Sequence, residues 1–151
     1  MIPRFGCYLF DIDGTLLDSA RDICGAVQAI LREHEHRETD FEFLKSYIGR
    51  HLHDLFGDLG YSSERSDELL QLYRANYAAR NHSQTTIYPG ALEGIERLAG
   101  RKATATTKGT PMTRVVLERF GFLPYFDHVQ GTDGFPAKPA PDVIFAALKG
   151  V

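Results

Sequence analysis

The sequence lacks the features that mark membrane and secreted proteins. Its longest apolar run near the N-terminus is Cys7–Phe10, far shorter than the roughly 20 residues that a membrane-spanning helix needs. Residues 1–6 carry one basic side chain, but no long apolar stretch or small-residue cleavage site of a secretory signal follows. These absences predict a cytoplasmic protein without a membrane partner.

The sequence also has only two cysteines and no excess of basic residues. Cys7 and Cys24 form neither a disulfide framework nor a metal-binding spacing, so we expect small apolar side chains in a reducing compartment. The 17 Lys and Arg residues are outnumbered by 20 Asp and Glu residues, which argues against a nucleic-acid partner. With 43% hydrophobic and 25% charged residues, the composition excludes a disordered or fibrous chain and leaves the oligomeric state open.

The hydrophobic pattern changes twice along the chain. Cys7–Phe10 is continuously apolar, which is typical of a parallel strand covered by helices on both faces. Residues 16–85 show helical periodicity and predict four amphipathic helices. From residue 86 onward, helices and strands alternate. This order predicts an α/β domain, with residues 1–15 and 86–151 in the core and residues 16–85 inserted as an all-helical segment.

Turn and capping signals divide the second half of the chain. Strands are predicted at residues 102–106 and 126–130. Thr110, followed by a proline, predicts the start of a helix with Thr110 as its N-cap, and Gly121 predicts its end. A last helix is predicted from Asp142 onward.

Two acidic residues follow the first predicted strand, at the end where parallel sheets place their working residues. One of the pair Asp11 and Asp13 can act as a nucleophile or metal ligand, and the other can donate and accept protons. Gly14 supports a tight turn, and Thr15 begins a segment whose backbone amides can meet an anion. A solvated turn is the alternative, which the apolar strand disfavours. A calcium loop is also disfavoured, because the glycine is fourth and Asp22 is twelfth when counted from the first aspartate.

Two further segments bring polar groups to the same sheet edge. The second of the predicted strands leads into Thr106, Thr107 and Lys108, which offer two hydroxyls and a cation to a phosphate. A helix-capping turn is the alternative for this segment. Lys138 lies in a proline-rich loop after the third predicted strand, where an ammonium group can neutralise a phosphate and a negatively charged nucleophile. A solvated lysine in a rigid loop is the alternative.

Together these segments resemble the first three motifs of the haloacid dehalogenase superfamily. The motifs are Phe10–Leu16, Ala105–Lys108 and Lys138–Asp142, and their order and spacing match as well. The inserted segment resembles the C1-type cap of the phosphoglycolate phosphatase-like branch, in particular through Asp11–Ile23 and Ser46–Gly49. The resemblance covers essentially the whole chain and implies a Rossmann-like parallel sheet with an inserted helical cap.

The resemblance also implies the mechanism of a magnesium-dependent phosphatase. Asp11 would attack phosphorus to form an aspartyl-phosphate, and Asp13 would protonate the leaving oxygen and then activate water. The Asp11 carboxylate and the Asp13 backbone carbonyl would hold Mg²⁺. Thr106 would donate a hydrogen bond to the phosphoryl group, and Lys138 would balance its charge. Further substrate contacts are expected from Gly14, Thr15, Thr107 and Lys108.

The chain departs from the family pattern at two places. Thr107 stands where an asparagine is common in the branch. Family members continue after the lysine motif into a fourth strand, where a Gly-Asp motif and further acids complete the magnesium site. This chain ends at Gly150-Val151 without a Gly-Asp pair after Lys138. We therefore expect a truncated chain that lacks the last strands of the core.

Phosphoglycolate is the leading candidate substrate, followed by a nucleotide, pyrophosphate or a sugar phosphate. Arg50 in the inserted segment is a candidate for binding a substrate carboxylate or a second phosphate, and a solvated arginine is the alternative. Two other functions remain open: a phosphomutase, which excludes water and returns the phosphoryl group to a second hydroxyl, and an inactive fragment that only binds phosphate. The pairs His34/His36 and His51/His53 lack a zinc-binding spacing, so surface or half-buried roles are expected.

Overall fold

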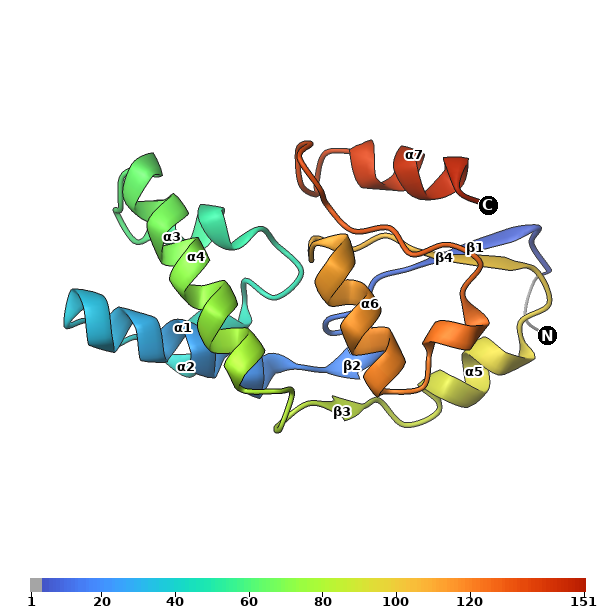
Figure 1. Ribbon diagram of the computed structural model, residues 1–151, viewed down its shortest axis with the longest axis horizontal. Coiled ribbons are helices and arrows are strands. Elements are labelled where there is room, and N and C mark those ends of the chain that lie inside the picture. The colour runs from blue at the N-terminus through green and yellow to red at the C-terminus, as the bar shows by residue number, and fades with distance from the viewer. Residues whose placement is uncertain (1–3) are drawn as a thin grey trace. The chain divides into compact units, whose positions relative to one another are not determined.

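The computed structural model describes residues 4–151 of the chain (Figure 1). The chain divides into two compact units. The sheet unit contains the residues up to Asp18 together with Ile87–Val151, and the helical unit contains Ser19–Thr86. The sheet unit is therefore built from two separate stretches of the sequence, and the helical unit from the single stretch between them.

A parallel pair of strands lies at the centre of the sheet unit. β1, Cys7–Phe10, pairs with β4, Arg101–Thr104, so that Cys7 is opposite Arg101 and Phe10 is opposite Thr104. The parallel sheet predicted from the sequence is confirmed. Two short strands, β2 at Leu17–Asp18 and β3 at Thr86–Ile87, form a second sheet. Neither of these two-residue strands was predicted.

The strand predicted at residues 126–130 is reduced to one parallel bridge, between His128 and Ala103 on β4. Side chains take over part of the ladder beside this bridge. The Lys102 amide donates to the Asp127 carboxylate at 2.8 Å, and the Gln130 amide donates to the Thr104 hydroxyl oxygen at 2.8 Å. The segment therefore runs along β4 without regular strand pairing, and the prediction of a full strand was wrong.

Helices cover both faces of the parallel pair, as Figure 1 shows: α5, Ala91–Arg97, and α6, Thr110–Arg119, lie on one side, and α7, Asp142–Lys149, lies on the other. A 3₁₀ turn at Leu123–Tyr125 follows α6. The core on the α5 and α6 side is formed by Ile12, Leu16, Leu17, Ile95, Val116, Leu117, Phe122 and Val129. The smaller core under α7 is formed by Ala103, Ala105, Val143 and Ala147. The sheet is thus apolar on both faces, so its polar chemistry is confined to the strand ends.

The start of α6 differs from the prediction. Gly109 is the N-cap, and Thr110 is already inside the helix, so the expected capping role of Thr110 was wrong. Asp133 lies in the loop after residues 126–130. Its carboxylate accepts a hydrogen bond from the Thr110 amide at 2.9 Å and another from the Thr110 hydroxyl. Asp133, which is distant in the sequence, therefore accepts the hydrogen bond from the Thr110 amide that a local N-cap side chain would otherwise accept.

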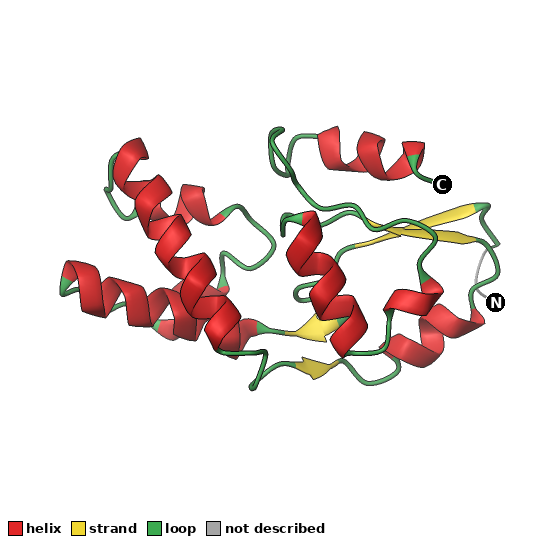
Figure 2. Ribbon diagram, viewed as in Figure 1, coloured by secondary structure: helices red, strands yellow, loops and turns green. Residues whose placement is uncertain are grey.

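The helical unit contains four helices (Figure 2). They are α1 at Ala20–Glu35, α2 at Phe41–Lys45, α3 at Leu52–Asp58 and α4 at Ser63–Ala79. α1 packs against α2 and α4, and α3 packs against α4. None of the helices within residues 4–151 is both long and apolar enough to cross a membrane.

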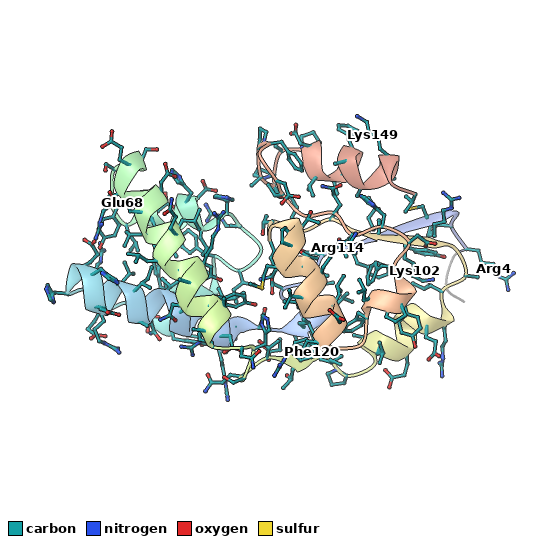
Figure 3. The ribbon with its side chains drawn as sticks, in the orientation of Figure 1. Arg4, Glu68, Lys102, Arg114, Phe120 and Lys149 are labelled. Carbon is teal, nitrogen blue, oxygen red and sulfur yellow. The ribbon has the colours of Figure 1, made fainter. Side chains whose placement is uncertain are left out.

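Charged groups link the helices of this unit. Arg65 on α4 donates to Glu35 on α1 at 2.7 Å and also pairs with Glu68, which Figure 3 labels on α4. Asp22, in the first turn of α1, is fully buried. Its carboxylate accepts hydrogen bonds from the Thr85 hydroxyl at 2.7 Å, the Gln84 amide at 2.9 Å and the Arg80 guanidinium at 3.4 Å. The start of α1 is thus tied to the segment that follows α4.

Candidate active site

Polar side chains meet at the carboxyl ends of β1 and β4. Asp11 directly follows β1, and Thr106 lies two residues after β4. Lys138 approaches from the loop before α7, and its Nζ lies 3.0 Å from Asp11 Oδ2. The same Nζ donates to the carbonyl oxygen of Ala105 at 3.2 Å. Lys138 therefore joins the ends of both strands, and the Asp11 and Lys138 side chains each remain 25% exposed.

A tight turn redirects the chain directly after Asp11. The amide of Gly14 donates to the Leu17 carbonyl at 2.9 Å, and the amide of Thr15 donates to the Ile12 carbonyl at 3.2 Å. Gly14 has a φ of 78°, a left-handed conformation that favours glycine. Gly14 and Thr15 are exposed, whereas Asp13 is buried. The turn thus places the second aspartate inside the protein and the glycine at the surface.

The loop after β4 supplies a second cation. Lys108 Nζ lies 3.3 Å from Asp13 Oδ2, and each side chain is only 9% exposed. The hydroxyl of the fully buried Thr106 accepts a hydrogen bond from the Lys108 amide at 3.3 Å. Thr107, between them, is half-buried. The structure therefore gathers all predicted site residues of the sheet unit into the two loops after β1 and β4 and the loop that carries Lys138.

The site balances its own formal charges. Each of the two aspartates faces one lysine, so the four side chains together carry no net charge in their usual ionisation states. Opposite charges within about 4 Å stabilise each other strongly when solvent access is limited. A ligand that brings negative charge to Asp11 and Lys138 would give this group of side chains a net negative charge.

The donor atoms of this site are of the type that Mg²⁺ prefers. The Asp11 carboxylate and the Asp13 backbone carbonyl are both hard oxygen ligands. Within residues 4–151, no three His, Cys, Asp or Glu side chains are grouped so that they would hold a metal ion. Mg²⁺ usually binds through one or two carboxylates and takes its other ligands from water and substrate phosphates. The residues present fit a magnesium ion that is completed by phosphate and water.

Sequence reasoning missed two residues that support the site. The hydroxyl of Thr132 donates to the carbonyl oxygen of Thr106 at 2.9 Å, and the Thr132 amide donates to the Lys108 carbonyl at 3.0 Å. Asp133, the next residue, holds the start of α6 through Thr110. A usable signal was present, because polar residues follow this sheet segment just as they follow β1 and β4.

Arg50, the predicted binding residue of the helical unit, is held by two neighbours. Its guanidinium carbon lies 4.5 Å from the centre of the Tyr47 ring, and its Nη2 lies 3.8 Å from Asp58 Oδ2. The Tyr47 hydroxyl donates to the same Asp58 oxygen at 2.8 Å, and this hydrogen bond raises the pKa of Tyr47. The Arg50 side chain is still 53% exposed, so its guanidinium is oriented by these contacts and accessible to an anion.

Comparison with known proteins identifies the family. The family described as haloacid dehalogenase-like hydrolase matches residues 8–151. The chain belongs to this family. The chain is 36% identical over 142 residues to phosphoglycolate phosphatase from Nitrosospira multiformis, covering 86% of this chain and 62% of that protein. It is also 30% identical over 131 residues to tyrosine-protein kinase PtkA from Mycobacterium tuberculosis, covering 83% of this chain and 45% of that protein.

Solved structures show the same fold. A predicted phosphatase from Clostridium acetobutylicum has a TM-score of 0.86 and 27% identity, over 97% of this chain and 70% of that one. The structure of Mycobacterium tuberculosis PtkA has a TM-score of 0.81 and 28% identity, over 95% of this chain and 68% of that one. The chain spans less than two thirds of the length of the two curated relatives named above. The predicted resemblance to the superfamily and its phosphoglycolate phosphatase-like branch is confirmed.

Proposed function

We propose that the sheet unit carries the reaction site of a magnesium-dependent phosphatase that acts on a small phosphorylated metabolite. The observation that supports this most directly is the 3.0 Å pair between Asp11 Oδ2 and Lys138 Nζ at the strand ends. A partly exposed carboxylate can reach a ligand, and the ammonium group beside it can balance the charge of a phosphate. The names of the relatives, phosphoglycolate phosphatase and predicted phosphatase, support the same reaction class.

In the proposed mechanism, Asp11 forms a bond to phosphorus as the bond from phosphorus to the leaving oxygen breaks. Asp13 takes up a proton with the substrate, gives it to that oxygen, and then takes a proton from the water that attacks the aspartyl-phosphate, so that Asp11 and phosphate are released. The Thr106 hydroxyl donates a hydrogen bond to the transferring group, and Lys138 balances its charge. The Asp11 carboxylate and the Asp13 carbonyl would hold Mg²⁺, which would supply positive charge to the phosphoryl oxygens.

The charge balance of the site supports the requirement for a divalent cation. Without ligand, the two aspartates and two lysines cancel each other. A phosphate dianion adds two negative charges, which the proton on Asp13 offsets only in part, and a divalent cation would offset the rest in a setting where unbalanced charge is costly. The proposal includes a cytoplasmic location, where the free thiols of Cys7 and Cys24 stay reduced.

The proposed substrate is phosphoglycolate, and the helical unit is the proposed cap. The bounds predicted from the sequence, residues 16–85 for the cap and residues 1–15 and 86–151 for the core, differ by a few residues from those of the two compact units. Arg50 is the proposed ligand of the substrate carboxylate, because its guanidinium is both oriented and exposed. The contacts at Gly14, Thr15, Thr107 and Lys108 with the substrate phosphate belong to the same proposal.

The test compares hydrolysis of p-nitrophenyl phosphate and phosphoglycolate by the 151-residue chain with that by Asp11→Asn, with and without Mg²⁺. Asp18→Asn is the matched control, because Asp18 is an exposed aspartate of the same unit. We expect the parent and the control to turn over only with metal, and Asp11→Asn to lose about a thousandfold or more in kcat. Folding of all three proteins is checked by circular dichroism and thermal unfolding.

Two results would contradict the proposal. Metal-independent turnover, or equal turnover by the parent and Asp11→Asn, would exclude the aspartyl-phosphate mechanism. If all three folded proteins bind inorganic phosphate without any hydrolysis, this chain is a phosphate-binding unit, and the phosphatase assignment fails for residues 1–151.

A further inference from the structure

The segment Gly131–Asp133 makes five hydrogen bonds to the loop after β4 and to Thr110, the first residue of α6. The Thr132 hydroxyl donates to the Thr106 carbonyl at 2.9 Å, and the Thr132 amide donates to the Lys108 carbonyl at 3.0 Å. The Gly131 amide donates to the Thr110 hydroxyl oxygen at 2.8 Å, and the Asp133 carboxylate accepts from both the amide and the hydroxyl of Thr110. These contacts bracket Thr106, Thr107 and Lys108, the residues of that loop that belong to the proposed site.

The two loops also approach each other too closely for an additional carbon atom. A Cβ placed on Gly131 would lie 2.3 Å from the Lys108 carbonyl oxygen and 2.4 Å from the Thr110 nitrogen. Such distances are far below van der Waals contact, so only glycine permits this approach. The hydrogen bonds and the close packing act on the same stretch of backbone and leave it little freedom.

We propose that Thr132 and Asp133 are positioning residues that fix the Thr106 hydroxyl and the Lys108 ammonium for the phosphoryl-transfer reaction. This inference rests on the proposed function. Neither residue needs to touch the substrate, because both act through the backbone and the helix start that carry Thr106 and Lys108. Displacement of a reacting group by about 1 Å can lower a rate by two orders of magnitude, so the rate should depend on these contacts.

Thr132 and Asp133 hold opposite ends of the loop after β4, which explains why two residues are needed. The hydroxyl of Thr132 holds the backbone at Thr106, the start of the loop. The carboxylate of Asp133 holds Thr110, the first residue of α6 and the end of the loop. A loop fixed at both ends keeps the Lys108 side chain directed at Asp13, 3.3 Å away. Loss of either contact leaves one end of the loop free to shift.

The experiment uses the 151-residue chain with four substitutions. Thr132→Val removes the hydroxyl but keeps the shape, and Thr132→Ser restores a hydroxyl. Asp133→Ala removes both carboxylate acceptors, and Asp18→Ala removes an exposed carboxylate of the same unit as the matched control. Two readouts are taken for each protein: steady-state hydrolysis of p-nitrophenyl phosphate with Mg²⁺, and amide hydrogen exchange at Lys108, Thr110 and Thr132.

We expect Thr132→Val and Asp133→Ala to lower kcat by about tenfold or more, with a much smaller change in KM. Amides of the loop should exchange faster in these two variants, while the midpoint of thermal unfolding stays close to that of the parent. Thr132→Ser should recover most of kcat, and Asp18→Ala should match the parent. A purely structural role would instead lower the amount of folded protein without changing kcat per folded molecule.

The inference is overturned if both Thr132→Val and Asp133→Ala keep the parental kcat, or if their losses follow the unfolded fraction alone. A parent chain that hydrolyses nothing would count against the proposed function. In that case hydrogen exchange decides, because parental exchange rates in Thr132→Val and Asp133→Ala would show that the two contacts do not hold the loop.

Discussion

Asp22 in the helical unit and Asp11 in the sheet unit both pair with a basic side chain, but their surroundings differ. Asp22 is fully buried, and Arg80, Gln84 and Thr85 donate hydrogen bonds to it from the segment after α4. Asp11 keeps a quarter of its side chain exposed beside Lys138. A sealed carboxylate stabilises the fold, whereas an accessible one can meet a ligand. The contrast shows that an ion pair alone does not distinguish Asp22 from Asp11, whereas their exposure does.

The largest loss of stability is expected on removing the buried carboxylate of Asp22. Asp22→Ala leaves the Thr85 hydroxyl and Gln84 amide without their acceptor and Arg80 without its counter-charge. The free energy of unfolding should fall by about 3 kcal/mol. Urea unfolding measures this, and Asp11→Asn is the comparison that should change stability much less. Equal losses of stability in the two variants would remove the contrast between the aspartates.

A smaller loss of unfolding free energy is expected on substitution of Gly131 in the sheet unit. Gly131→Ala forces a Cβ against the Lys108 carbonyl oxygen and should cost about 1–3 kcal/mol of unfolding free energy. Gly94→Ala is the control, because a Cβ at this position of α5 has no neighbour within 4 Å, and it should add about 0.5–1 kcal/mol. Thermal unfolding of both variants checks the prediction. A stable Gly131→Ala protein would mean that the two loops move apart freely.

Arg50 sharpens the comparison, because it is an exposed charged group in the helical unit. Arg50→Ala should raise KM for phosphoglycolate by about tenfold, the loss expected for one charge-assisted hydrogen bond. KM for p-nitrophenyl phosphate should not change, since that substrate has no carboxylate. Arg32→Ala is the control, because Arg32 is also an exposed arginine that pairs with a carboxylate, that of Glu38. A parallel rise for both substrates would point to the phosphate as the partner of Arg50.

The smallest effect is expected at the two cysteines. Burial raises the pKa of the Cys24 thiol to about 11, so at pH 8 only about one molecule in a thousand carries the thiolate. Cys7 is half-buried. Iodoacetamide at pH 8 should therefore leave Cys24 unmodified in the folded protein, while both thiols react in urea. Mass spectrometry of the labelled peptides measures this, and fast labelling of Cys24 without denaturant would show that α1 opens.

Local sequence signals predicted most of the fold, because helices and strands of this size carry their own hydrophobic periodicity. The signal failed for β2 and β3, which have only two residues each. It also failed for residues 126–130, where the side chains of Asp127 and Thr104 replace part of the strand ladder. Periodicity reports which side chains are apolar and does not report which backbone groups find a strand partner.

The site was predictable where chemistry follows a strand directly, as it does for Asp11. The structure brings Asp11, Thr106 and Lys138 to one edge, as parallel strands require. The role of Asp133 was not predictable from capping rules, because they consider neighbours within a few residues and Asp133 lies 23 residues from Thr110. Contacts of this kind depend on tertiary structure, so the sequence indicates that polar residues follow the segment but not which groups they bind.

Asp22 has one more consequence, for how this chain can be cut and rejoined. Because its carboxylate binds Gln84 and Thr85, the first helical turn and the last residues of the helical unit are fastened to each other within that unit. Such a segment has both ends at one place and keeps its own packing, which are the conditions under which insertion into another chain is tolerated. We therefore expect that residues 19–86 can be inserted into another protein chain, joined to it at two adjacent points.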